Sequence, residues 1–396
     1  MASPVQHSGA PSARGLRELA ALFLRLGATS FGGPAAHVAL MEHEIVHRRQ
    51  WISRDAFMDV VGAVNLIPGP NSTEVAIHVG YTRAGWRGLI VAGTSFILPA
   101  AILVTVLAWS YVRFGSVPAL VAVLYGIKPV VLAIIVQAIW RLSRATLRTS
   151  RKVAIAALSI VLSVMGVHEL IVLAVAAIAG LATSGVRETS NPLLLPWNWS
   201  AIWGARHGPL ALGAAAPASA VGLWPLFGVF LKIGSVLFGS GYVLLAFLRA
   251  DLVERYHWIT ERQLLDAIAV GQVTPGPLFT SATFIGYVIG GLPGAAVATI
   301  GIFLPAFIFV GLSGPILPKL RQNRAAGGFL DGVNAASLAL MAVVTAYLAR
   351  TALIDLPTLA LAIGAACVLL WTSLNATWVI AAGALAGWLL HGSLRV

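Results

Sequence analysis

Charged side chains are scarce in this sequence of 396 residues: Asp, Glu, Lys and Arg together make up 10%, and hydrophobic residues make up 58%. A water-soluble domain carries about 25% charged residues. This deficit excludes a water-soluble fold. The stretches 88–112 and 267–318 contain no Asp, Glu, Lys, Arg or His, and each is longer than the roughly 20 apolar residues that a membrane-spanning helix needs. The sequence therefore predicts an all-α polytopic membrane protein.

Cysteine is almost absent as well. The single cysteine, Cys367, excludes an intramolecular disulfide and any metal site built from several thiolates.

The segment 1–15 is polar and lacks the apolar run and cleavage site of a signal peptide, so we expect the first apolar segment to be retained. None of the lysines follows a glycine, as the G-x-x-x-x-G-K-[ST] loop of ATP-binding proteins requires. We expect no ATP-driven pump, no cofactor and no bound metal.

The net charge of +12 has a different origin from that of a nucleic-acid-binding protein. The basic residues gather in short loops between apolar segments, where Lys and Arg set the orientation of membrane helices. We expect the lipid bilayer to be a partner and nucleic acid not to be one.

The sequence contains an internal repeat. Shifted by 207 places, residues 23–27 align with 230–234, 51–53 with 258–260, and the Pro-Gly-Pro motif 68–70 with 275–277. After a shift of one residue, 80–81 align with 286–287 and 98–99 with 304–305. So many matches of Gly, Pro and Trp at nearly one spacing indicate a duplication. We expect a polar tail at 1–15, a first repeat at 16–185, a linker at 186–221 and a second repeat at 222–396.

The two halves differ in their loop charges. In the first half, basic residues gather around the repeated motifs and at 141–152, whereas in the second half they gather at 319–324, in the loop equivalent to the one near Arg113. Because Lys and Arg favour the cytoplasmic side, the halves are expected to have inverted topology, with an odd number of crossings in each. We expect about five crossings per half and about 10–12 transmembrane segments in all.

The Pro-Gly-Pro motifs predict broken or re-entrant helices, because proline lacks the N–H that an interior helical turn needs. Matching breaks in two halves are typical of a central binding site. The polar residues after each break can cap a new helix, whose first N–H groups favour an anion. The alternative is a kink that serves only packing. The breaks contribute these substrate-binding candidates: Pro68, Gly69, Pro70, Asn71, Ser72, Pro275, Gly276, Pro277 and Thr280.

A few charged residues lie in or near the apolar segments. Charges in a membrane are unfavourable by roughly 3 kcal/mol or more, so they indicate function unless they reach the interface or form structural ion pairs. Arg25 and Lys232 occupy equivalent repeat positions and are the two cationic candidates for substrate binding. The candidates for coupling or gating include Asp59, Glu74, Lys128 and Asp266.

One motif favours a different class of protein. Residues 43–47 match the H-E-x-x-H zinc pattern, which would make a membrane-embedded metalloprotease. Against this, the equivalent segment 250–254 keeps an acid, Asp251, but has no histidine, and no third ligand is evident. We therefore expect no catalytic residues and no enzyme.

The chain resembles the chromate ion transporter family in its two-domain form. The resemblance rests on Phe31-Gly32-Gly33-Pro34, the run 48–51, the two Pro-Gly-Pro motifs and the segment 232–239, and it covers nearly the whole chain. It implies a multi-pass protein of the bacterial cytoplasmic membrane that exports chromate and confers resistance. It also places Arg25, His37, Glu44, Trp51 and Lys232 at motif positions, and so adds His37 and Glu44 to the candidates for coupling or gating.

The expected substrate is chromate or another sulfate-like tetrahedral oxyanion, and the expected mechanism is secondary transport. A dianion that leaves a negative-inside cell gains roughly 2.3 kcal/mol per charge per 100 mV, so the membrane potential alone favours export. Coupling to a proton taken up by Asp59, Glu74 or Asp266 could contribute. A carrier for sulfate or another anion with the same fold is the alternative, a channel is another, and a homodimer is left open.

The inverted arrangement predicts the outcome of cysteine labelling. With Cys367 replaced, single cysteines at the repeat-equivalent positions Arg144 and Arg350 should react with an impermeant thiol reagent from opposite faces of the membrane. Labelling of both positions from one face would contradict the inversion.

Overall fold

The computed structural model describes residues 13–31, 33–115, 117–183, 221–238, 241–313, 324–372 and 374–393. The predicted linker lies outside these residues except for position 221, and the predicted tail lies outside them except for 13–15. All regular secondary structure in the described residues is helical, as expected. The first half consists of α1 (Ala13–Thr29), α2 (Gly33–Glu42), the π-helix η1 (His43–Arg48), α3 (Arg54–Val64), α4 (Asn71–Phe114), α5 (Pro118–Thr146), α6 (Ser150–Val164) and α7 (Glu169–Thr183). The second half consists of α8 (Leu223–Val236), η3 (Gly241–Val243), α9 (Leu244–Leu248), the π-helix η4 (Arg249–Arg255), α10 (Glu261–Val273), η5 (Leu278–Thr280), α11 (Ser281–Ser313), α13 (Arg324–Ala352), α14 (Leu356–Trp371) and α15 (Ala376–Ser393).

The order of these elements repeats, which confirms the duplication. Within the described residues, each half has a first helix, a π-helical segment, a short helix before Pro-Gly-Pro, a long helix after it and three further helices. Both π-helices are followed by an N-capped helix: Ser53 accepts a hydrogen bond from the N–H of Ala56, and Thr260 forms a capping box with Gln263.

Each Pro-Gly-Pro motif breaks a helix, as predicted. In the first half α3 ends at Val64 and α4 begins at Asn71, and in the second half α10 ends at Val273 before the 3₁₀ turn η5. The central glycines have φ values of 145° at Gly69 and 90° at Gly276, which side chains rarely allow.

The long helices after the breaks reverse direction soon after they begin. Non-helical φ and ψ angles occur at Ala84 and Gly85 in α4 and at Gly290 and Gly291 in α11. The reversal brings the backbones of Gly80 and Gly88 together, and a Cβ atom built on Gly80 would lie 2.3 Å from the carbonyl oxygen of Gly88. The first limb of α4, residues 71–83, is about 20 Å long at 1.5 Å per residue, which is shorter than a hydrocarbon core. Each break is therefore followed by a short limb and a tight helical hairpin.

The two breaks are tied to the opposite halves by crossed hydrogen bonds. The N–H of Gly69 donates to the carbonyl oxygen of Leu237 at 2.7 Å, and the N–H of Gly276 donates to the carbonyl oxygen of Ser30 at 2.9 Å. Gly69 and Gly276 are repeat equivalents, as are Ser30 and Leu237. Each Pro-Gly-Pro therefore uses a backbone donor, which the interrupted helix leaves unpaired, to hold the end of the other half's first helix.

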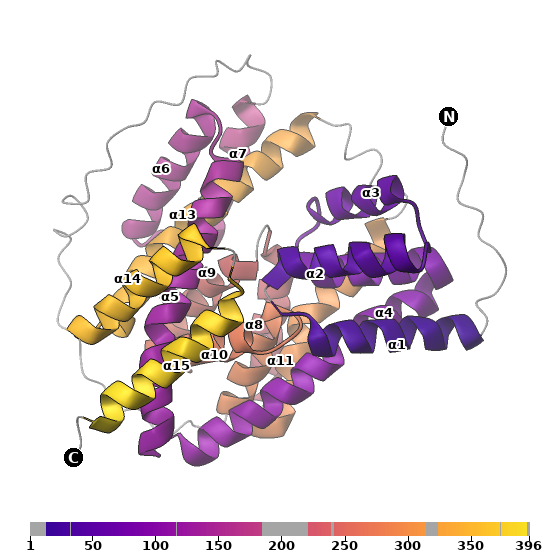
Figure 1. Cartoon of the computed structure of the whole chain (residues 1–396). Helices are drawn as coiled ribbons and strands as arrows, with labels where there is room; N and C mark the ends of the chain where they lie inside the picture. The colour runs from indigo at the N-terminus through magenta and orange to yellow at the C-terminus, as the bar shows by residue number, and fades with distance from the viewer. Residues whose placement is uncertain are drawn as a thin grey trace.

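The last two helices of each half also pack on the other half. α6 and α7 pack against α13, whereas α14 and α15 pack against α5 (Figure 1). Glycines permit both contacts: a Cβ on Gly126 would lie 2.0 Å from the carbonyl oxygen of Gly383, and a Cβ on Gly332 would lie 2.0 Å from that of Ala176. These contacts are repeat equivalents, and they interlock the halves.

Two ion pairs connect the start of each π-helix to the short helix that follows it, with opposite signs in the two halves: Glu42 directly precedes η1, and Arg249 begins η4. Arg54 Nε lies 3.2 Å from Glu42 Oε1, and Arg249 Nη2 lies 2.7 Å from Glu261 Oε1. Glu42 corresponds to Arg249 in the repeat, and Arg54 corresponds to Glu261. The attraction is thus preserved while both charges are exchanged.

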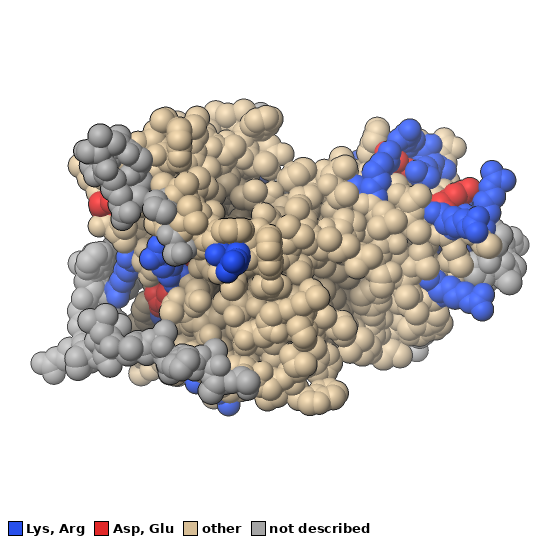
Figure 2. Space-filling view, turned by 90° about the horizontal axis from the view of Figure 1, so that it is seen from below, with Lys and Arg blue, Asp and Glu red and all other residues tan. Residues whose placement is uncertain are grey.

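The outer surface is that of a membrane protein. Four helices of the described chain are long and apolar enough to cross a bilayer: Asn71–Phe114, Ala119–Thr146, Leu278–Ser313 and Ala325–Ala352. Along α4 one face exposes Ile90, Leu98, Ile102, Val106 and Trp109. On the face shown in Figure 2, Lys and Arg gather toward the two ends of the molecule, and a broad uncharged surface lies between them. This arrangement places apolar side chains against lipid and basic ones near water.

The crossed hydrogen bonds make Gly276 sensitive to substitution. A Cβ there would lie 2.7 Å from that of Ala100 and 3.0 Å from the carbonyl oxygen of Gly27, in addition to the strain of a positive φ. We expect Gly276→Ala to destabilise the protein by about 1–3 kcal/mol and to lower its melting temperature in detergent. The control is Gly364→Ala, where the added Cβ meets nothing within 4 Å and should be neutral or stabilising. Equal melting temperatures for the two variants would contradict a close backbone contact at Gly276.

A candidate anion cavity between the halves

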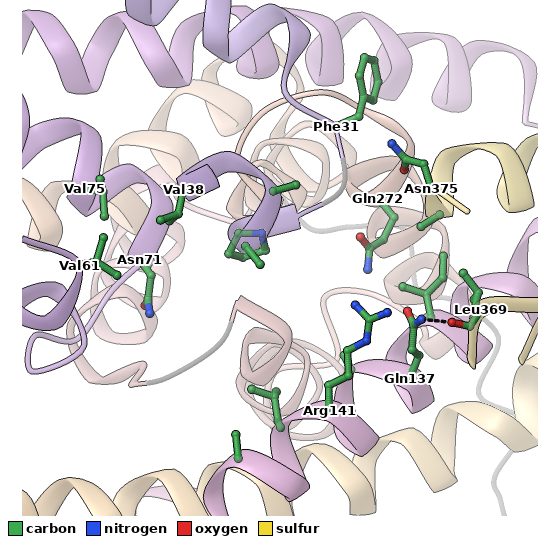
Figure 3. A pocket seen from close by; sticks show the side chains of 18 of the residues that line it. Phe31, Val38, Val61, Asn71, Val75, Gln137, Arg141, Gln272, Leu369 and Asn375 are labelled. Atoms are coloured by element: carbon green, nitrogen blue, oxygen red, sulfur yellow. Dashed lines mark hydrogen bonds between the residues drawn. The ribbon is translucent and has the colours of Figure 1, made fainter. Parts of the chain in front are cut away.

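A cavity of about 1160 Å³ lies between elements of both halves. Residues from α2, α3, α4 and α5 line it, together with Gln272 of α10, Asn334 of α13 and the segment around the start of α15. In Figure 3, Val38, Val61, Asn71 and Val75 lie on one side of the opening, and Gln137, Arg141, Gln272 and Asn375 lie on the other. The cavity thus lies between the start of α4, just after the first break, and the polar end of α5.

Among the described residues, the lining has one charged side chain and a set of neutral polar ones. Arg141 is the charged residue. It is exposed at the opening, and no hydrogen bond or ion pair to it is found within the part of the chain that the structure describes. Its guanidinium group extends from α5 into the opening (Figure 3). Gln137, one helical turn earlier, donates from Nε2 to the carbonyl oxygen of Leu369. The remaining polar lining residues are Asn65, Asn71, Thr146, Gln272, Asn334, Asn375 and Thr377.

Two of the amides are repeat equivalents that precede the two breaks. Asn65 and Gln272 are separated by 207 places, three residues before Pro68 and Pro275 respectively. Asn65 accepts a hydrogen bond of 2.8 Å from Nδ2 of Asn71. Nε2 of Gln272 is buried without a hydrogen-bond partner among the described residues. A buried donor without a partner is unfavourable by about 1–3 kcal/mol, so this amide is suited to a ligand oxygen.

Arg25 and Lys232, the cations predicted to bind substrate, form equivalent ion pairs outside this lining. Arg25 Nη2 lies 2.5 Å from Glu44 Oε1, and Lys232 Nζ lies 2.5 Å from Asp251 Oδ2. Glu44 and Asp251 are themselves repeat equivalents. Each cation thus has a carboxylate beside it on the π-helical segment of its own half.

The ion pairs of Glu44 also decide whether the H-E-x-x-H motif at residues 43–47 is suited to catalysis. The carboxylate of Glu44 is held by Arg25 and by Arg48, whose Nη1 lies 3.0 Å from Oε1. Burial by itself would raise the pKa of Glu44, but the hydrogen bonds and charges of Arg25 and Arg48 outweigh it and hold the pKa below its ordinary value. A carboxylate bound by arginines is a poor general base, so η1 has a structural role here.

Lys128 and Asp266 form a buried ion pair between the halves. Lys128 Nζ of α5 lies 2.9 Å from Asp266 Oδ1 of α10, and the side chains are 10% and 2% exposed. The hydroxyl of Tyr111, on α4, donates to the other carboxylate oxygen at 2.8 Å. The pair therefore joins three helices from both halves at a depth where a lone charge would be strongly unfavourable.

His37 connects the first break to the second. The histidine is buried, and its Nε2 lies 3.1 Å from the carbonyl oxygen of Ser30, the same oxygen that accepts from Gly276. Because a carbonyl only accepts, Nε2 carries the proton, and Nδ1 can accept from the Ser72 hydroxyl at 3.3 Å. Burial lowers the pKa of His37 to about 4, so the neutral ring is the stable form near pH 7.

Glu74 is the most isolated carboxyl group in the described chain. It is fully buried in the first turn of α4, and neither carboxyl oxygen has a hydrogen-bond partner among the described residues. Ionisation without a partner is unfavourable by several kcal/mol even after relaxation, whereas a helix N-terminus recovers at most about 2 kcal/mol. Desolvation is thus the larger effect, and this environment favours the neutral acid.

Of the predicted site residues, Asn71 lines the cavity, and the breaks are joined through Gly69 and Gly276 rather than through side chains. Ser72, Glu74 and Thr280 are buried close to the breaks, whereas Asp59 is exposed on α3. Sequence reasoning missed Arg141, Gln137 and Gln272. Arg141 stood in a basic loop cluster, and the position three residues before each Pro-Gly-Pro, polar in both halves, was the available signal for Gln272.

Known proteins resemble this chain over most of its length. The family model described as Chromate transporter matches residues 17–181 and 224–388. A chromate transport protein of Cupriavidus metallidurans is 34% identical over 94% of this chain and 92% of its own. One of Pseudomonas aeruginosa is 33% identical with the same coverage, and a probable chromate transport protein of Synechococcus elongatus is 31% identical over 87% of each chain. No solved structure is similar enough to match. Together with the apolar helices, these transport proteins confirm a multi-pass integral membrane protein that is not an enzyme.

The buried ion pair between the halves predicts an asymmetric response to mutation. Lys128→Met leaves the Asp266 carboxylate buried with only Tyr111, and we expect a destabilisation of about 3–5 kcal/mol. The double variant Lys128→Met with Asp266→Asn should recover much of this, because no charge is then left unpaired. The control, Lys152→Met, removes a partner of Asp331, whose side chain is 49% exposed, and should change stability by at most about 1 kcal/mol. Melting temperatures in detergent measure all three, and a double variant no more stable than Lys128→Met would contradict the pairing.

Proposed function

Because the chain belongs to the chromate transporter family, we propose that it is a secondary transporter that exports chromate across the cytoplasmic membrane, and that the cavity between the halves holds the ion. The observation that carries this proposal is the guanidinium of Arg141, unpaired within the described chain, facing neutral amide groups from both halves. Chromate has four oxygens that accept hydrogen bonds, and a guanidinium can donate to two of them at once.

The charge of the site is suited to a dianion. Arg141 supplies one positive charge, and the start of α4, where Asn71 lines the cavity, adds about half a charge from the N-terminal N–H groups. Gln272 and Gln137 can supply neutral hydrogen-bond donors, which orient the bound ion and still let it leave the site. A site with two free cations would bind the dianion more tightly and release it more slowly.

The membrane potential supports the direction. A dianion that leaves a negative-inside cell gains about 4.6 kcal/mol at 100 mV, equivalent to a concentration ratio of over a thousandfold. No ATP-binding loop occurs in the sequence, and none is needed for this gradient. The cavity forms within one chain, so the homodimer that the sequence left open is not required.

Sulfate is the second candidate substrate. Its tetrahedral shape and charge match those of chromate. The described lining, an arginine and several amides, would contact the oxygen atoms of either anion and would distinguish chromium from sulfur only weakly. Competition by unlabelled sulfate in a chromate flux assay separates a selective chromate carrier from a general oxyanion carrier.

The proposal predicts that Arg141 is required for transport. Arg141→Gln should reduce chromate flux in reconstituted vesicles by about tenfold or more, because hydrogen bonds to charged groups contribute about 1.5–3 kcal/mol. Arg141→Lys should retain more flux than Arg141→Gln, because the charge is kept while the forked geometry is lost.

The matched control is Arg144→Gln on the same helix. Arg144 lies over the ring of Trp140, 4.7 Å from its centroid, and does not line the cavity. The chromate flux of Arg144→Gln should therefore stay within about twofold of that of the parent protein. If Arg141→Gln, present in the membrane at the same level as the parent protein, transported chromate at the parental rate, the cavity would not be the chromate-binding site. Arg25→Gln and Lys232→Gln, measured alongside, test the prediction from sequence that these two cations bind the substrate: if they do, each variant should lower chromate flux by more than tenfold.

A further inference from the structure

We propose that Glu74 is a proton-binding site of the transporter and that its proton travels with the anion. This inference rests on the proposed function and adds to it a coupling ion and the residue that carries it. The sequence offered three carboxyl groups as candidates for taking up a proton, Asp59, Glu74 and Asp266, and the structure places them in different surroundings. Asp266 is paired with Lys128 and Tyr111, and Asp59 is exposed. Glu74 alone of the three is enclosed, with both carboxyl oxygens lacking a hydrogen-bond partner in the described chain.

Glu74 lies at the joint between the halves. An ideal Cβ on Gly69 would lie 2.5 Å from Glu74 Oε1 and 3.5 Å from the Cβ of Ala306, on α11 of the other half. Gly69 also makes the crossed hydrogen bond to Leu237. Any movement of one half against the other at this joint therefore changes the surroundings of the carboxyl group and can admit water to it.

No described cation neutralises this carboxyl group. The buried or half-buried titratable groups on the described helices that pack against α4 are His37, Glu42, Glu261, Asp266 and Tyr287. None of them forms a hydrogen bond or ion pair with Glu74, and Glu42, Glu261 and Asp266 are bound to Arg54, Arg249 and Lys128. On α4 itself, His78 lies one turn after Glu74, and its Nδ1 has no partner in the described chain. In the enclosed state the carboxyl group must therefore hold a proton, and when water reaches it the proton can leave.

The position of Glu74 beside the cavity sets the direction of coupling. Asn71 and Val75, in the same turn of α4, line the cavity. A dianion there and an ionised Glu74 would repel each other, whereas a dianion and the neutral acid would not. Proton and dianion are thus expected to bind together and to cross the membrane in the same direction: the carboxylate takes up one proton on the side where the dianion enters and releases it on the other. The membrane potential then acts on a net charge of −1 per chromate in place of the −2 of the dianion alone, so coupling lowers the gradient that the potential can support.

The test uses the full-length protein in sealed vesicles with the voltage held at zero. An outward chromate gradient should drive protons outward with the parent protein, measured with a pH-sensitive dye. Glu74→Gln mimics the neutral acid, so it should exchange labelled chromate for unlabelled chromate at a rate within about threefold of the parent but move no protons. Chromate's own protonation is the same in both samples, so the difference between them reports on residue 74. The matched control Asp59→Asn should move protons as the parent does.

Each outcome decides between the proposals. A parent protein that exchanges chromate but moves no protons, or moves them opposite to chromate, overturns the role of Glu74 and leaves the proposed function intact. Proton movement that persists in Glu74→Gln, or a loss of exchange in that variant at equal folded amount, also overturns it. A parent protein without chromate exchange contradicts the proposed function itself.

Discussion

The structure depends on two hydrogen bonds that cross between the halves. A Pro-Gly-Pro sequence inside a membrane protein leaves backbone groups without helical partners, and in a medium without water these groups must be satisfied by protein. Here the N–H of Gly69 and the N–H of Gly276 each find the carbonyl oxygen at the end of the other half's first helix. The breaks therefore fix the halves against each other, which in turn positions α4, the buried carboxyl group of Glu74 and the cavity beside them.

The interlocked packing extends this dependence to the whole chain. Because α6 and α7 pack on α13 while α14 and α15 pack on α5, neither half buries its own helices without the other. The close glycine contacts on α5 and α13 leave little space for adjustment at these interfaces. The repeat is thus a unit of sequence and of local structure, but the packed body is the complete chain. A relative movement of the halves would have to occur at the breaks and hairpins, where the backbone already departs from helical geometry.

The architecture could be predicted from the sequence, but the pairing of side chains could not. The duplication, the helix breaks and the membrane class follow from composition and from the spacing of Gly, Pro and Trp, and all three are confirmed. The repeat also showed an acid at both positions 44 and 251, yet only the structure shows that these acids hold Arg25 and Lys232. The cavity was not predictable, because its donors are amides from helices far apart in sequence. Arg141, near the end of α5, also belongs to a basic cluster that in the sequence indicates only topology.

The sign-reversed pairs, Glu42 with Arg54 and Arg249 with Glu261, have a consequence for how a duplicated chain folds. Two similar halves present similar surfaces during synthesis, and exchange of equivalent segments is a characteristic failure of such proteins. If the start of the π-helix of one half docked on the short helix of the other, Glu42 would meet Glu261, or Arg249 would meet Arg54. Both mismatches repel, while both correct pairings attract. Reversal of the signs in one half thus lets each segment distinguish its own half from the other before the helices interlock.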